Sequence, residues 1–147
     1  MQVGIPISCA TETALEALGQ ELGSQLPVGA VLILSGPLGA GKTTFTRGLA
    51  RAVGASAAVT SPTFAIIHEY PTPSGPFVHV DAYRLSGPRE LLSIGLLETI
   101  EQARLTAIEW GEGLLELNVL DAPWLVCIEL TAGGRAVTLT PPREAAR

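Results

Sequence analysis

Hydrophobic residues recur along the chain with two spacings, one typical of helices and one typical of buried strands. Thr11 is a favoured helix N-cap, and apolar residues follow it every three or four positions until Pro27, which predicts a first helix. The continuous apolar run at residues 31–34 predicts a strand buried on both faces. After a glycine-rich turn, helical spacing resumes over residues 43–53. This region is therefore predicted to form a strand, a loop and a helix.

Further short strands are predicted where β-branched and aromatic residues gather. They cover residues 64–70, 77–81, 105–109, 124–130 and 135–139. Proline and glycine between two of these runs predict an antiparallel hairpin loop at 71–76, and residues 131–134 predict a second tight turn. Leucine spacing over 88–102 predicts one or two short helices that break near Gly95. Together these elements predict an α/β fold of three layers, with a mixed, mainly parallel sheet and antiparallel additions.

The composition fits one folded domain over residues 1–147. Hydrophobic residues make up 47% of the chain and charged residues 16%, which excludes a disordered protein. The longest apolar run is too short to cross a bilayer, and the N-terminus carries no visible targeting signal. We therefore expect a cytoplasmic protein with no membrane partner.

The charge balance disfavours one class of function, unaided nucleic-acid binding. There are 14 acidic and nine basic residues, and the net charge of −5 has the wrong sign for gripping a nucleic-acid backbone unaided. All the basic residues are arginines except Lys42, the single lysine of the chain. Its position therefore calls for a local explanation.

Lys42 lies in a Walker A pattern, Gly-Pro-Leu-Gly-Ala-Gly-Lys-Thr at residues 36–43, between a predicted strand and a predicted helix. Glycines let successive backbone N–H groups converge on phosphate oxygens at a helix N-terminus. The lysine adds a compact charge, and the hydroxyl of Thr43 can reach a bridging magnesium ion. The competing interpretation is a glycine-rich turn without a ligand, which the matching flanks disfavour. The loop glycines are Gly36, Gly39 and Gly41.

A phosphate loop of this kind also needs a carboxylate near the magnesium ion. Asp81 and Glu109 each end a predicted strand, where ligands of open α/β sheets bind. One would hold the metal and the other would orient water, although either could instead cap the segment that follows. Asp121 follows no predicted strand and is the weaker candidate.

Several other residues have competing interpretations. Thr63, in the segment Ser-Pro-Thr-Phe, is placed to contact the γ-phosphate as a switch threonine or to form a plain turn. For His79, Tyr83 and Arg84, which flank Asp81, a structural role is favoured. For Trp110 the composition favours a place in the core.

These motifs together resemble the TsaE (YjeE) family of small bacterial P-loop ATPases, in tRNA threonylcarbamoyladenosine biosynthesis. The resemblance rests on the phosphate loop, Ser-Pro-Thr-Phe at 61–64, His-Val-Asp-Ala-Tyr-Arg-Leu at 79–85 and Ile-Glu-Trp at 108–110, and covers about residues 8–140. Family members usually have leucine where this chain has Ala82, a change in packing rather than in polar chemistry.

The resemblance implies a function. Members bind ATP and Mg²⁺ and hydrolyse ATP in complex with TsaB and TsaD, which install threonylcarbamoyl on the adenosine beside the tRNA anticodon. This subunit would contact tRNA only indirectly, through the complex. The implied catalytic residues are Lys42, Asp81 and Glu109, and the implied magnesium ligands are Thr43 and Glu109. The implied nucleotide-binding residues are Glu12, Thr13, Gly36, Gly39, Ala40, Gly41, Lys42, Thr43, Thr44, Thr63, Asp81, Trp110 and Arg135.

Two other functions compete with this one. A small P-loop kinase acting on a nucleoside or metabolite would need a lid rich in arginine or lysine, and none is evident. A GTP-dependent switch would need an Asn-Lys-x-Asp segment, but residues 118–121 lack the lysine.

Overall fold

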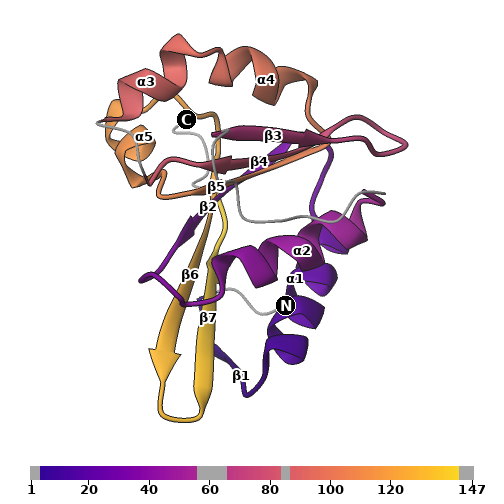
Figure 1. The fold of residues 1–147 in the computed structure, drawn as a ribbon, viewed down its shortest axis with the longest axis vertical. Helices are drawn as coiled ribbons and strands as arrows, with labels where there is room; N and C mark the ends of the chain where they lie inside the picture. The colour runs from indigo at the N-terminus through magenta and orange to yellow at the C-terminus, as the bar shows by residue number, and fades with distance from the viewer. Residues whose placement is uncertain (1–3, 56–65, 84–86, 143–147) are drawn as a thin grey trace, which may run out of the picture.

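A computed structural model describes residues 4–55, 66–83 and 87–142. In this part of the chain, seven strands form one sheet in the order β1-β7-β6-β2-β5-β4-β3, with helices on both faces (Figure 1). The strands are β1 (Ile7–Cys9), β2 (Ala30–Ser35), β3 (Ile67–Tyr70), β4 (Phe77–Asp81), β5 (Leu105–Glu109), β6 (Trp124–Thr131) and β7 (Gly134–Thr140). The helices are α1 (Glu12–Gln25), α2 (Lys42–Ala52), α3 (Pro88–Ser93), α4 (Leu96–Gln102) and α5 (Glu112–Leu117).

The centre of the sheet is parallel and its edges are antiparallel. β2 pairs with both β5 and β6 in parallel, and β4 pairs with β5 in parallel. The β3–β4 and β6–β7 hairpins and the short strand β1 add antiparallel pairs at the two edges. The mixed sheet and both hairpins predicted from the sequence are confirmed.

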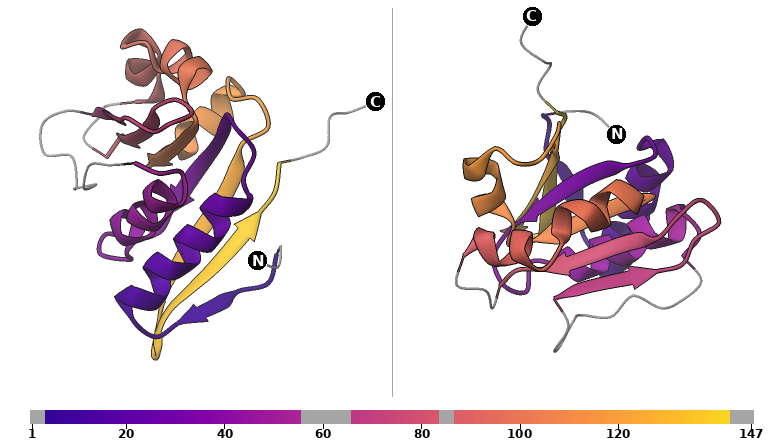
Figure 2. Two further views of the ribbon diagram at one scale, coloured as in Figure 1. Left: turned by 90° about the vertical axis from the view of Figure 1, so that its right-hand side faces the viewer. Right: turned by 90° about the horizontal axis from the view of Figure 1, so that it is seen from above.

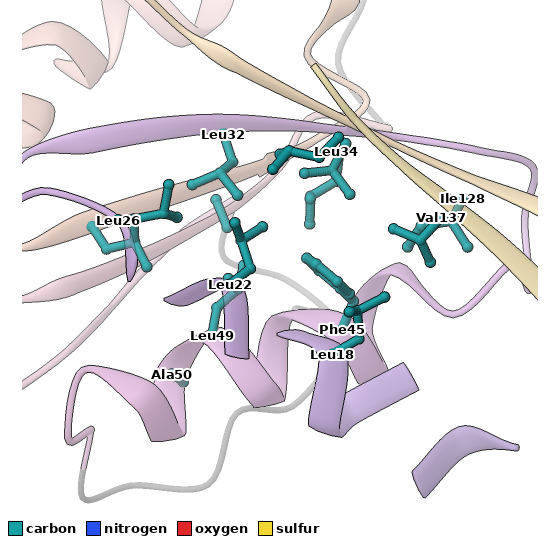
Figure 3. Close-up of a cluster of buried hydrophobic side chains, with 14 of the residues drawn as sticks. Leu18, Leu22, Leu26, Leu32, Leu34, Phe45, Leu49, Ala50, Ile128 and Val137 are labelled. Carbon is teal, nitrogen blue, oxygen red and sulfur yellow. The ribbon is translucent and has the colours of Figure 1, made fainter. Parts of the chain in front are cut away.

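The sheet separates two hydrophobic cores, because side chains alternate between its faces. On one face, Leu32 and Leu34 of β2 pack against α1 and α2, as Figure 3 shows. On the other, Val31 and Ile33 belong to the core that includes Leu91 of α3, Leu96 of α4 and Leu114 of α5. The views in Figure 2 show the same arrangement of helices on either side of the sheet. The predicted three-layer architecture is therefore confirmed.

Capping residues and hydrophobic spacing predicted the positions of most helices and strands. The Oγ1 atom of Thr11 accepts a hydrogen bond from the N–H of Ala14 at 3.1 Å, which is the predicted cap of α1. The helical region over 88–102 divides at Gly95, as expected. The strand predicted from residue 64 begins at Ile67 in the structure, and residues 64 and 65 lie outside the described ranges.

Two short elements were not predicted. β1 has three residues and α5 has six, and neither shares a longer hydrophobic period with a neighbour, as the six-residue α3 does with α4. Both form through tertiary contacts, β1 by pairing with β7 and α5 by burying Leu114. Within the described ranges, no helix is long and apolar enough to cross a membrane.

Candidate functional site

The loop between β2 and α2 has a backbone that only glycine accommodates easily. Gly36 has φ of 149°, and a Cβ there would lie 2.4 Å from the carbonyl oxygen of Ile128. Gly41 has φ of 105°, and its Cβ would lie 2.4 Å from Cδ2 of Leu15. Gly41 is also the N-cap of α2, so the loop leads directly into a helix N-terminus with Lys42 as its first residue.

Lys42 is a buried cation with 6% of its surface exposed. Its ammonium donates hydrogen bonds to the carbonyl oxygens of Gly36 at 2.6 Å and Pro37 at 3.1 Å, and lies 4.1 Å from the ring centroid of Trp110. Burial lowers the pKa of Lys42, and the negative charges of Glu109, Glu112 and Asp81 partly offset this effect. The lysine therefore contributes a concentrated positive charge beside the loop.

The two strand-end carboxylates lie side by side. Asp81 is the register partner of Glu109 in the parallel β4–β5 pair, and β5 is in turn the neighbour of β2, which carries the phosphate loop. Glu109 is 5% exposed, and its Oε2 accepts hydrogen bonds from Oγ1 of Thr43 at 3.4 Å and from Nε2 of His79. Asp81 accepts a hydrogen bond from the N–H of Tyr83 at 3.0 Å. Sheet topology thus brings both acids to the loop.

A cleft of about 330 Å³ lies between the loop and these strand ends. The residues that line it are Glu12, Leu38, Gly39, Gly41, Lys42, Thr43, Thr44, Asp81, Tyr83, Glu109 and Trp110. The remaining predicted residues within the described ranges, Thr13, Gly36, Ala40 and Arg135, are not among those that line it. Thr63 and Arg84 lie outside the described residues.

Arg135 binds backbone carbonyls of the phosphate loop. Its Nε donates to the carbonyl oxygen of Ala40 at 2.8 Å, and one terminal nitrogen donates to the carbonyl oxygen of Gly39 at 3.1 Å. The other terminal nitrogen donates to the carbonyl oxygen of Gly134 at 3.1 Å. The side chain therefore connects β7 to the loop, while its predicted proximity to phosphates stays a prediction.

The structure changes the interpretation of three aromatic residues. Trp110, for which composition favours the core and the resemblance implies a nucleotide contact, is half-buried, has φ of 62° and lines the cleft. Its ring packs against that of Tyr83, with centroids 4.9 Å apart and an angle of 47° between the planes. Tyr83, like His79, was assigned a structural role, yet the first lines the cleft and the second contacts Glu109. The strand alternation that puts His79 and Asp81 on one face was the available signal.

The oxygen atoms in the cleft suit magnesium as part of a nucleotide complex. Mg²⁺ prefers oxygen ligands and is commonly held by one or two protein groups together with phosphates and water. Thr43 and Glu109 provide two such oxygens, 3.4 Å apart. In the described ranges, no group of three or more histidine, cysteine, aspartate or glutamate side chains is arranged to hold a metal ion. A magnesium ion here would therefore need further ligands from phosphate and water.

Comparisons with known proteins identify the relatives of this chain. The family model "Threonylcarbamoyl adenosine biosynthesis protein TsaE" matches residues 9–136. Proteins named tRNA threonylcarbamoyladenosine biosynthesis protein TsaE are similar: 45% identical in Streptomyces coelicolor (69% of this chain, 70% of the relative) and 36% in Borreliella burgdorferi (78% and 83%). The crystal structure of YdiB from Bacillus subtilis has a TM-score of 0.75 and 28% identity, over 95% of this chain and 86% of that one. The chain belongs to the TsaE family of tRNA threonylcarbamoyladenosine biosynthesis proteins.

Proposed function

We propose that this chain binds ATP with Mg²⁺ in the cleft and hydrolyses it as a cytoplasmic subunit of tRNA threonylcarbamoylation, together with TsaB- and TsaD-type proteins. The observation that carries the proposal is the convergence of the phosphate loop, Lys42 and two strand-end carboxylates on one cleft. Family membership supplies the pathway. The arrangement of charges supports the proposed reaction type, because phosphoryl transfer depends on positioning and on electrostatic stabilisation.

Each group has a role in this proposal. Backbone N–H groups at the start of α2 would bind phosphate oxygens, and Lys42 would offset the charge that develops as the γ-phosphate leaves. Thr43 and Glu109 would hold Mg²⁺, which when bound would offset the negative charge of the phosphates. Asp81 would orient water at the edge of the cleft.

The proposed dependence on partners has its own support. In the structure, the ammonium of Lys42 is engaged by the carbonyls of Gly36 and Pro37. A partner or nucleotide that reshapes the loop would release this charge toward the cleft. The acidic net charge also leaves tRNA contact to the other subunits.

Phosphate release by the chain, alone and with its TsaB and TsaD counterparts, tests the proposal. We expect slow hydrolysis by the isolated chain, faster hydrolysis in the complex and loss of both when Mg²⁺ is removed by a chelator. Equal and rapid hydrolysis with and without partners would contradict the partner dependence. Transfer of the γ-phosphate to a nucleoside or metabolite would support the kinase alternative instead.

A further inference from the structure

His79 is a buried polar residue that the proposed function leaves without a task. It lies in β4 with its side chain fully buried, two residues before Asp81 and on the same face of the sheet. Its register partner in β5 is Ala107, whose small side chain leaves space for the imidazole to extend toward the end of that strand. There, Nε2 of His79 hydrogen-bonds to Oε2 of Glu109.

The pattern of hydrogen bonds defines which nitrogen carries the proton. Because a carboxylate oxygen accepts, Nε2 must be the donor in this contact. Nδ1 is buried and has no hydrogen-bond partner among the residues that the structure describes. The geometry therefore assigns the N–H group at Nε2 as the donor to Glu109.

The hydrogen bond from His79 constrains the carboxylate of Glu109. Oε2 of this carboxylate is held from the sheet by His79 and from the first turn of α2 by Thr43. A carboxylate with two donors on one oxygen loses much of its freedom to rotate. Side chains that orient a metal-binding group in this way commonly change metal affinity or activity by about 10- to 100-fold when they are replaced.

We propose that His79 is a positioning residue for Glu109, holding its carboxylate through the Nε2 hydrogen bond in the orientation that magnesium binding and turnover require. The kinetic consequence rests on the proposed ATPase function. The contact itself does not, so the two can be tested separately.

The contact is tested by nitrogen-15 NMR of the free, isotope-labelled chain. Only two histidines occur, so a His68→Gln variant assigns the imidazole signals. We expect His79 to show a proton on Nε2 at neutral pH. An Nε2 without a proton would overturn the inference.

The role is tested by comparing His79→Leu with His79→Gln in the reconstituted complex. Glutamine can place an N–H donor close to the position of Nε2, whereas leucine fills similar space without a donor. We expect the leucine variant to lower kcat for phosphate release about 10- to 100-fold and to need more Mg²⁺, with KM for ATP changing less than about threefold. The glutamine variant should recover most of the loss.

The outcomes separate the two proposals. The positioning role would be overturned by unchanged turnover in the leucine variant. It would also be overturned if both variants lost turnover equally while circular dichroism showed that both are folded. Absence of turnover in the unaltered complex would contradict the ATPase function instead. If the variants fail to fold, the NMR measurement on the unaltered chain decides the inference.

Discussion

Lys42 concentrates the positive charge of the candidate site in one side chain. Its ammonium is held by two backbone carbonyls and an indole face, and three carboxylates act on it from neighbouring elements. A lysine ammonium is compact and its hydrogen-bonding directions rotate freely, whereas an arginine is a planar fork. This difference explains why a chain that otherwise uses arginine has its one lysine here.

Replacing Lys42 should abolish turnover. We expect Lys42→Ala to lower phosphate release in the complex by about 100-fold or more, ~3 kcal/mol, because it removes the charge that stabilises the departing γ-phosphate. Arg51→Ala is the matched control, since Arg51 lies on the same helix with an exposed side chain that pairs with Glu16 at 3.6 Å. A Lys42→Ala complex that is as active as the control would show that the role is misassigned.

The lowered pKa of Lys42 predicts a pH dependence of stability. Because burial disfavours the charged form in the folded state, the folded pKa lies below the ordinary value of 10.5. Between the two values the unfolded chain binds more protons, so the free energy of unfolding should rise with pH in that window. Denaturant unfolding at about pH 8, 9 and 10 should therefore show the native protein gaining stability relative to Lys42→Met. A constant or falling difference would contradict this prediction.

At the scale of elements, α1 and α2 pack unusually closely through glycine. A Cβ on Gly19 would lie 2.3 Å from the carbonyl oxygen of Phe45, and one on Gly48 would lie 2.0 Å from that of Glu16. Both obstacles are backbone atoms, so the helices themselves would have to separate. This contact matters for the site because α1 carries Glu12 and α2 begins with Lys42.

Gly48→Ala should therefore destabilise the protein despite the higher helix propensity of alanine. We expect a loss of about 2 kcal/mol or more in the free energy of unfolding. At Gly133, a Cβ would meet no atom within 4 Å. Gly133→Ala should therefore change the free energy of unfolding by less than about 0.5 kcal/mol. Thermal or denaturant unfolding of the two variants provides the comparison, and equal stabilities would refute the packing argument.

Arg135 connects β7 to the phosphate loop and should affect nucleotide affinity. Its hydrogen bonds to the carbonyls of Gly39 and Ala40 hold the loop through two consecutive backbone oxygens. We expect Arg135→Ala to weaken binding of a fluorescent ATP analogue by about tenfold, because the loop loses charge-assisted hydrogen bonds. Arg104→Ala, which removes a longer 3.4 Å bond to Pro27, is the control. Unchanged affinity in Arg135→Ala would show that the loop holds its shape without this contact.

At the scale of the whole molecule, the cleft exists only because distant segments meet. Its lining comes from the start of α1, the phosphate loop and the ends of β4 and β5. The sheet order places β5 between β2 and β4, so the loop and both acids are brought to adjacent strands. The same molecule carries a net charge of −5, which repels other anions from its surface.

We therefore expect the isolated chain to bind tRNA weakly. Fluorescence anisotropy with labelled tRNA at physiological salt should give a Kd above about 100 μM, weaker than ordinary non-specific binding by basic proteins. Adding the TsaB and TsaD counterparts should produce tight binding. Micromolar binding by the chain alone would contradict the proposal that the partner subunits contact the tRNA.

The fold was predictable wherever a local period extended over enough residues. The helix after Thr11 and the strands at β4 and β5 follow from spacing and capping. Elements as short as β1 and α5 have no such period and depend on their neighbours. Composition alone favours the core for Trp110 and a structural role for Tyr83, because it does not specify on which side of a strand end a ring lies; only the resemblance indicates that Trp110 is near the site.

The sequence by itself predicted a phosphate loop and identified the strand-end acids, because both are encoded in consecutive residues with a known local geometry. Only the tertiary structure decided that Asp81 and Glu109 are neighbours, that His79 holds Glu109 and that Arg135 binds the loop from β7. Such contacts depend on strand order and register across the sheet. Local periodicity specifies which face a side chain occupies, whereas long-range packing specifies what it meets there.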